Sequence, residues 1–146
     1  MYENNKPNDE LENLITEGGI YSRFYIDPNI SKKQYEKMHK LWIANSTNKK
    51  IAKTVLVIKK TGRIVGFIAL GEKNGRGNIV YIVVRSDMRG RGLGKILISS
   101  AHRWYILNNY KYVQAETQEA NITACTMYEK VGYHLEKEQD FYHFWL

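Results

Sequence analysis

The chain has 146 residues, of which 43% are hydrophobic and 25% are charged, and this balance excludes a wholly disordered or collagen-like polymer. Its 22 basic and 15 acidic residues give a net charge of +7, which favours an anionic partner: a phosphate-bearing small molecule, a nucleic acid or a membrane surface. The single cysteine, Cys125, excludes an internal disulfide and a cysteine-based zinc site.

The length fits one domain over residues 1–146, with residues 1–10 as a loose acidic tail. Leu11, Leu14 and Ile15 are spaced as the apolar face of a short helix, which we expect to end at Gly18 and Gly19. The polar start lacks the pattern of a signal peptide and no apolar run is long enough to span a bilayer. We therefore predict a cytoplasmic protein without a membrane partner.

An aromatic segment and a second helix follow. Residues 20–30 predict an extended aromatic stretch that is broken by a turn at Pro28. Ser31 is a favourable N-cap for an amphipathic helix over residues 32–44. The apolar face predicted for this helix consists of Tyr35, Met38, Leu41 and Trp42.

The middle of the chain changes to the pattern of strands. β-branched runs over residues 54–59, 64–70 and 78–84 predict three antiparallel strands. Helical spacing then predicts a helix from about residue 95 to 109, followed by a strand over 112–117, a helix over 121–131 and an aromatic strand over 141–146. This order predicts an α+β, or mixed α/β, layer fold.

A basic glycine loop between a strand and a helix is the most informative segment. It reads Arg89-Gly90-Arg91-Gly92-Leu93-Gly94 and is followed by Lys95. Glycines let the backbone approach a ligand closely, and the unpaired N–H groups of a helix start attract anions, so we predict a pyrophosphate site. The dinucleotide and P-loop fingerprints both fail, because the sixth position from Gly90 is Lys95 where each needs glycine. A flexible basic turn is the alternative.

Two motifs in this half of the chain resemble those of the GCN5-related N-acetyltransferase (GNAT) family. The loop matches the family signature [Q/R]-x-x-G-x-[G/A], and residues 84–88 resemble its V-x-P-x-x lead-in, with Ser86 in place of the proline. Residues 121–133 resemble the family helix N-x-x-A-x-x-x-Y-x-x-x-G-[F/Y]. The resemblance implies a central, twisted and mostly antiparallel sheet flanked by helices.

A narrower resemblance is to the acetyltransferases of nucleotide-linked amino sugars, such as the dTDP-fucosamine enzymes. It is carried by residues 21–24, 27–28, 41–43, 116–118 and 142–145. It implies a small-molecule amine acceptor and leaves a homodimer open. We expect the protein to differ from some members of that subgroup by lacking their extra N-terminal domain.

The family resemblance implies acetyl-CoA as co-substrate and assigns residues to it. The pyrophosphate is expected at Arg89, Gly90, Arg91, Gly92, Leu93, Gly94 and Lys95. The pantetheine arm is expected along the main chain of Ile82, Val83 and Val84, where an amide would polarise the thioester carbonyl, with Asn121 bonding the arm or capping its own helix.

Two side chains are the catalytic candidates that the resemblance implies. Tyr128 is expected to give a proton to the departing thiolate, against the alternative of a packed core aromatic. Glu116 is the candidate base for the amine proton, against the alternatives of an exposed strand-end carboxylate and a water chain. The spacing of the four histidines predicts no metal site, and His143 either faces the acceptor or is structural.

We therefore predict direct acetyl transfer to a primary amine, most specifically on a nucleotide-linked amino sugar. A protein N-terminus or another small amine is the alternative acceptor. A second class is a nucleic-acid-binding module built on Arg85, Arg89, Arg91 and Lys95 with Tyr81 and Trp104, although no nucleic-acid motif is present and we predict no nucleic acid partner. A third is a CoA-binding relative without turnover.

Overall fold

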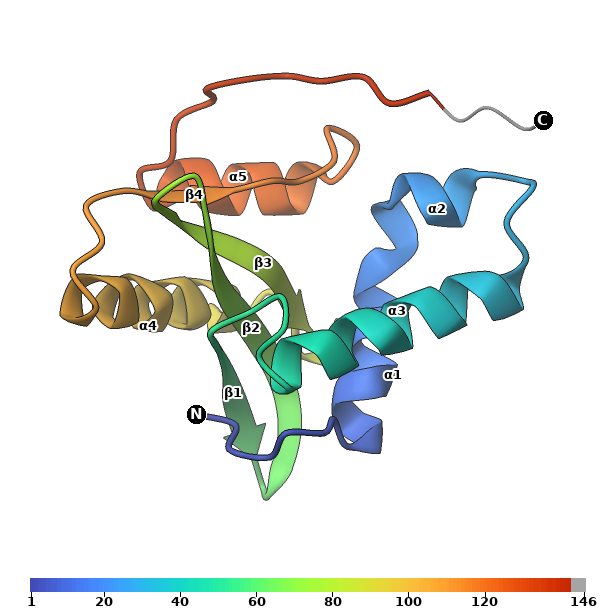
Figure 1. Cartoon of the computed structure of the whole chain (residues 1–146), viewed down its shortest axis with the longest axis horizontal. Coiled ribbons are helices and arrows are strands. Elements are labelled where there is room, and N and C mark those ends of the chain that lie inside the picture. The colour runs from blue at the N-terminus through green and yellow to red at the C-terminus, as the bar shows by residue number, and fades with distance from the viewer. Residues whose placement is uncertain (143–146) are drawn as a thin grey trace.

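The computed structural model describes residues 1–142, and helices cover both faces of one sheet within them (Figure 1). The elements in chain order are α1 (Asp9–Gly18), η1 (Gly19–Tyr21), α2 (Arg23–Ile26), α3 (Lys32–Thr47), β1 (Thr54–Lys60), β2 (Arg63–Lys73), β3 (Arg76–Val84), η2 (Ser86–Met88), α4 (Leu93–Leu107), β4 (Val113–Ala115) and α5 (Ile122–Lys130). The strand order is β1-β2-β3-β4, with β4 parallel to β3 and the other pairs antiparallel. The predicted fold class is confirmed.

Each face of the sheet carries its own core. Leu11, Leu14 and Ile15 of α1 and Ile43 of α3 pack with Phe67 on one face. On the other face the buried side chains of α4 and α5 pack on β2 and β3, and they include Leu97, Ile98, Ala101, Tyr105 and Tyr128. Strand alternation divides β3 between the two cores, because successive side chains point to opposite faces.

The segment predicted as extended is instead helical. Residues 19–26 form η1 and α2, and the Ser22 hydroxyl caps α2 by accepting a hydrogen bond from the Tyr25 N–H at 3.2 Å. Two aromatic rings of this segment pack on α3: Phe24 lies 5.7 Å from Trp42 and Tyr25 lies 5.2 Å from Tyr35, centroid to centroid. Packing against α3 therefore overrides the aromatic strand pattern.

The buried face of α3 also differs from the predicted one. Leu41 is 58% exposed, whereas the buried residues of this helix are Tyr35, His39, Ile43, Ser46 and Thr47. Both hydroxyls bond to carbonyls of their own helix, since Ser46 donates to the Trp42 oxygen at 2.9 Å and Thr47 to the Ile43 oxygen at 3.1 Å. Because their hydroxyls are hydrogen-bonded in this way, these polar side chains can lie on the buried face of the helix.

The two ends of the chain need further corrections. Within the expected tail, Asp9 and Glu10 are already helical, and the Tyr2 N–H donates to the Val55 oxygen of β1 at 2.8 Å. Phe141 and Tyr142 are not in a strand, and the rest of the strand expected over 141–146, with His143, lies outside the described residues. No helix within residues 1–142 is long and apolar enough to cross a membrane.

Tyr105 gives the first testable prediction, because its buried hydroxyl lies between two paired strands. The hydroxyl is 3.1 Å from the Gly71 oxygen and 2.8 Å from the Asn78 oxygen, and the residue is 0% exposed. We expect Tyr105→Phe to lower the free energy of unfolding by about 1–2 kcal/mol in urea denaturation, since both carbonyls lose this donor. The control is Tyr112→Phe, whose ring is 69% exposed. Equal losses in the two variants would contradict the assignment.

Candidate active site

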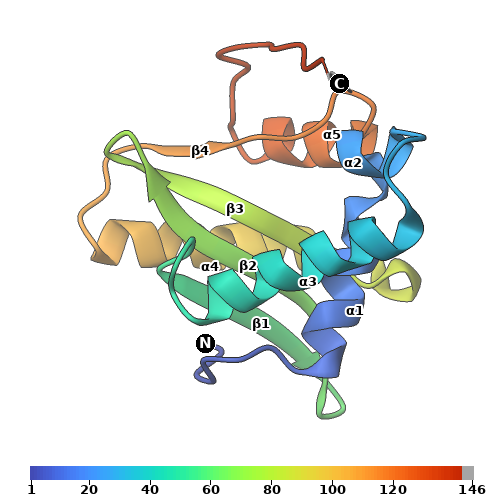
Figure 2. The ribbon, with the colours of Figure 1, turned by 45° about the vertical axis from the view of Figure 1, so that its right-hand side comes forward.

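The free edge of β3 is the first component of the site. β3 runs to Val84, but its pairing with β4 covers only Gly77, Asn78 and Ile79 (Figure 2). Val80 is an extra residue against β2, because Ile79 pairs with Leu70 while Tyr81 pairs with Ala69. Such a bulge bends and twists a strand, which explains why β4 diverges here. Among the described residues no strand covers this edge at Ile82, Val83 and Val84.

The glycine loop is the second component, and it leads into a helix start with free amides. Gly90 and Gly92 have φ angles of +74° and +77°, a left-handed conformation that favours glycine. Gly92 is the N-cap of α4 and supplies no side-chain bond. The first helical bond runs from the Ile96 N–H to the Gly92 oxygen at 3.1 Å, so the N–H groups of residues 93–95 precede it. This arrangement suits a phosphate-bearing ligand.

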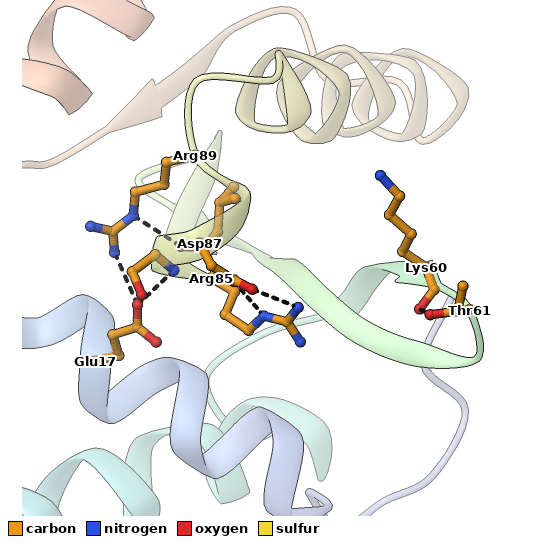
Figure 3. A network of polar contacts seen from close by, with 8 residues as sticks. Glu17, Lys60, Thr61, Arg85, Asp87 and Arg89 are labelled. Atoms are coloured by element: carbon orange, nitrogen blue, oxygen red, sulfur yellow. Dashed lines mark hydrogen bonds and ion pairs between the residues drawn. The ribbon is translucent and has the colours of Figure 1, made fainter.

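Acidic partners fix two of the arginines around the loop (Figure 3). Arg89 donates through Nε to the Val84 oxygen at 3.1 Å and lies 3.6 Å from Glu17, which also accepts the Ser86 N–H at 2.7 Å. Arg85 and Asp87 form a two-bond pair at 2.6 and 3.0 Å, and this pairing lowers the pKa of the Asp87 carboxyl. These contacts hold the loop in shape.

The other two basic side chains of the loop, Arg91 and Lys95, are better candidates for binding an anionic ligand. Arg91 and Lys95 are exposed and form no ion pair within residues 1–142. A groove of about 610 Å³ begins at Gly92 and Lys95 and follows α4 on its β1 side, where Arg103 and Leu56 contribute to its walls. The groove therefore adjoins the loop but is separate from the β3 edge, which faces β4.

Helix α5 is the third component and packs on the first turn of α4. A Cβ at Gly94 would lie 2.5 Å from the Met127 sulfur, so the two helices approach closely there. Asn121 accepts the Ala124 N–H through Oδ1 at 3.2 Å and thus caps α5. Tyr128 is 7% exposed, and burial raises its pKa well above the ordinary value. Its hydroxyl forms no hydrogen bond to any described residue, so the neutral phenol is available to donate a hydrogen bond to a ligand.

Glu116 lies apart from these three components. It follows β4 directly, its side chain is 68% exposed, and its carboxylate pairs with Lys73 at the hairpin between β2 and β3. The glycine loop follows the opposite end of β3. The structure thus brings the loop, the β3 edge and α5 together, but directs Glu116 toward the hairpin.

The aromatic residues of the nucleic-acid alternative pack against other rings of the protein. The Tyr81 ring contacts the rings of His39 and Trp42, and burial raises the pKa of Tyr81. Trp104 packs edge-on against Tyr105 at 5.2 Å.

No group of three or more His, Cys, Asp or Glu side chains suited to a metal ion occurs among residues 1–142. Cys125 donates weakly to the Gln118 oxygen at 3.7 Å.

One buried group at the sheet was missed by sequence reasoning. His39 is 0% exposed and its Nε2 has no hydrogen-bond partner. The available signal was its position four residues after Tyr35 and four before Ile43, which is the spacing of one helix face. The apolar residues Met38 and Leu41 obscured that signal because they suggested a different face.

Comparison with known proteins places these features in a family. The spore coat polysaccharide biosynthesis protein SpsD of Bacillus subtilis is 23% identical over 124 residues, covering 85% of this chain and 43% of that protein. An acetyltransferase of Pectobacterium atrosepticum is 35% identical over 78 residues, covering 53% of this chain and 55% of that protein. The chain spans about half the length of the curated relatives it matches.

Solved structures agree with the fold. A Bacillus anthracis protein assigned as a streptothricin acetyltransferase, in complex with acetyl-coenzyme A, is 31% identical with a TM-score of 0.54, covering 57% of this chain and 51% of that one. The PaiA N-acetyltransferase of Thermoplasma acidophilum, in complex with coenzyme A, shares the fold at 14% identity with a TM-score of 0.75, covering 90% and 86%. The profile of the acetyltransferase (GNAT) family matches residues 19–133, and the chain therefore belongs to the acetyltransferase (GNAT) family.

Proposed function

We propose that the protein transfers the acetyl group of acetyl-CoA to a primary amine by direct attack. The observation that carries this proposal is the free β3 edge, which ends at a glycine loop with an uncapped helix start. The amides of residues 90–95 would bind the pyrophosphate, with Arg91 and Lys95 adding charge. The main chain of Ile82, Val83 and Val84 would pair with the extended pantetheine arm, and one amide would polarise the thioester carbonyl.

Tyr128 is suited to assist the leaving thiolate. Its phenol is neutral at pH 7, burial raises its pKa further above the ordinary value, and its hydroxyl has no hydrogen-bond partner among the described residues. An ordinary thiol has a pKa of about 8.5, below that of the phenol, so full proton transfer to sulfur is uphill. We therefore assign Tyr128 a hydrogen bond to the developing thiolate, with the proton that completes CoA coming from solvent.

For the acceptor we propose an amino sugar linked to a nucleotide. The likeness to SpsD, a polysaccharide biosynthesis protein, extends over 85% of this chain and supports a sugar substrate. Rings of Tyr25, Tyr35 and Trp42 cluster beside the sheet face that carries Tyr81 and Val83, and aromatic faces pack well against sugars and bases. The position of Glu116 beside Lys73 argues against it as the base that contacts this amine.

The co-substrate is tested by thermal unfolding of the protein with separate ligands. Acetyl-CoA at 100 times its Kd should stabilise the native state by about 2.7 kcal/mol and raise the Tm, because it binds only the folded chain. NAD, ATP and a short single-stranded oligonucleotide serve as matched controls and should leave the Tm unchanged. A rise with the oligonucleotide alone would overturn the proposal.

The acceptor is tested by thiol release from acetyl-CoA. We expect turnover with dTDP-linked amino sugars and none with the corresponding dTDP-sugars that carry a hydroxyl in place of the amine, because only the amine is nucleophilic at neutral pH. A peptide with a free N-terminus is the competing substrate. Faster turnover of the peptide at equal concentration would reassign the acceptor while leaving acetyl transfer intact.

The role of Tyr128 is tested by Tyr128→Phe. We expect kcat to fall by about tenfold or more, since the hydrogen bond to the thiolate exists only as the bond to sulfur breaks, while the Kd for acetyl-CoA stays nearly unchanged. The Tm should also stay close to that of the wild type, because the hydroxyl has no described partner. Tyr142→Phe, at a residue 79% exposed, is the control. A parallel loss of affinity would make Tyr128 a packing or cofactor contact.

A further inference from the structure

A buried histidine with a free nitrogen lies on the face of the sheet opposite α5. His39 Nδ1 is 2.9 Å from the Tyr35 oxygen, and since a carbonyl only accepts, Nδ1 carries the proton. Nε2 is therefore a bare acceptor. Among the side chains that the structure describes, it is the one buried nitrogen or oxygen atom without a hydrogen-bond partner. Buried polar atoms are almost always paired in folded proteins, so this atom marks a position where a donor is missing.

The surroundings of the ring keep it neutral. Tyr35 and Trp42 of the same helix lie 4.1 and 4.7 Å from it, and Tyr81 of β3 lies 6.4 Å away, centroid to centroid. Burial lowers the pKa of His39, and no charged group contributes to that shift. Burial raises the pKa of Tyr35 to about 12 and also that of Tyr81, so neither phenol ionises near neutral pH.

Three consecutive residues connect this ring to the β3 edge. Glu17 accepts the Ser86 N–H just after β3, at 2.7 Å. Gly18 lies against Val83, where a Cβ would come within 2.6 Å of a side-chain methyl. Gly19 covers the imidazole, and a Cβ there would lie 2.3 Å from Nε2. The segment that contacts Val83 and His39 thus carries no side chain at either position.

We propose that His39 accepts the proton lost by the acceptor amine, and that the incoming acceptor displaces Gly19 from the ring and Gly18 from Val83. This inference rests on the proposed acetyl transfer. The amine N–H supplies the donor that Nε2 lacks, so the acceptor binds the displaced state more favourably than the covered one. Tyr81 and Val83 lie on the His39 side of β3, while Ile82, Val84 and Tyr128 lie on the other.

The step balances as follows. The amine nitrogen forms a bond to the thioester carbon, and the bond from that carbon to sulfur breaks. The N–H proton of the attacking nitrogen passes to Nε2, directly or through one water, and the imidazolium then releases it to solvent. The thiolate accepts a hydrogen bond from Tyr128 and takes its proton from solvent. Amine and acetyl-CoA thereby give the amide and CoA.

The first test compares His39→Asn and His39→Gln with the wild type. The Asn amide can still donate to the Tyr35 oxygen but places no base at Nε2, whereas Gln places a non-basic amide there. We expect both to lower kcat/KM for the amine by about 100-fold or more. The Kd for acetyl-CoA should stay within about twofold of the wild-type value, since this ligand is held by the loop and the β3 edge. His134→Asn, at an exposed histidine, is the matched control.

The pH profile separates a base from a merely structural ring. The values of kcat/KM are calculated for the concentration of unprotonated amine, which removes the titration of the substrate from the profile. Because the neutral imidazole is the active form, this wild-type kcat/KM should fall as the pH drops through the His39 pKa, which burial places below its usual value. The two variants should lack this acid limb at any residual rate. A wild-type level of kcat/KM in a folded His39 variant, or an unchanged acid limb, overturns the proposal.

Two further variants keep the outcome decisive. If neither His39 variant folds, Gly19→Ala would place a Cβ 2.3 Å from Nε2 and so disfavour the covered state, which should raise kcat/KM for the amine without changing the Kd for acetyl-CoA. Unchanged or lower kcat/KM in the folded variant would count against His39. A large loss in Glu116→Gln together with an active His39 variant assigns the proton to Glu116 instead. Failure of the wild type to bind acetyl-CoA would refute the proposed function itself, which is a separate outcome.

Discussion

The extra residue at Val80 is the constraint on which the site depends. Pairing between β3 and β4 stops at Ile79, one residue before the bulge. Among the described residues no strand pairs with the outer edge of β3 from there to Val84, whose oxygen accepts a hydrogen bond from Arg89. A regular ladder would have satisfied those backbone groups internally and left nothing for an extended ligand to pair with. The bulge also places Val80 and Tyr81 on the same face, so that Tyr81 meets His39 while Ile82 and Val84 face α4.

Helix α1 also fixes the position of the end of β3. The Glu17 carboxylate accepts the Ser86 amide and lies near Arg89, whose own Nε bonds the Val84 oxygen. Exposed ion pairs contribute little to the free energy of unfolding, so the significance of this network is geometric. It fixes the end of β3, the entry to the glycine loop and the two-glycine junction as one unit. A shift of α1 would therefore move the loop and uncover His39 together.

Local signals in the sequence were sufficient for the elements that form the cofactor side of the site. The β-branched runs predicted β1, β2 and β3, and the glycine loop and the Asn121 to Gly132 spacing predicted α4 and α5, because each depends on neighbours within one turn or strand. The buried face of α3 was not predicted. Leu41 is apolar and was expected in the core, whereas the hydroxyls of Ser46 and Thr47 donate to carbonyls of their own helix, so that these polar residues can be buried. Residues 20–26 were misassigned because contacts with Tyr35 and Trp42, outside the segment, decide their conformation. The partner of Glu116 is likewise 43 residues away.

The division of groups between the two faces of β3 has a chemical consequence. The nucleophile and the leaving group occupy different positions around one tetrahedral carbon, so the group that accepts the amine proton and the group that hydrogen-bonds the thiolate need not share a pocket. Here the phenol of Tyr128 belongs to the core beneath α4, and the imidazole of His39 belongs to the aromatic cluster under α3. Burial acts on the two in opposite directions, raising the pKa of the phenol and lowering that of the imidazole. Both groups are uncharged near neutral pH, so the phenol can donate a hydrogen bond to the departing thiolate and the imidazole offers a lone pair to the proton of the amine.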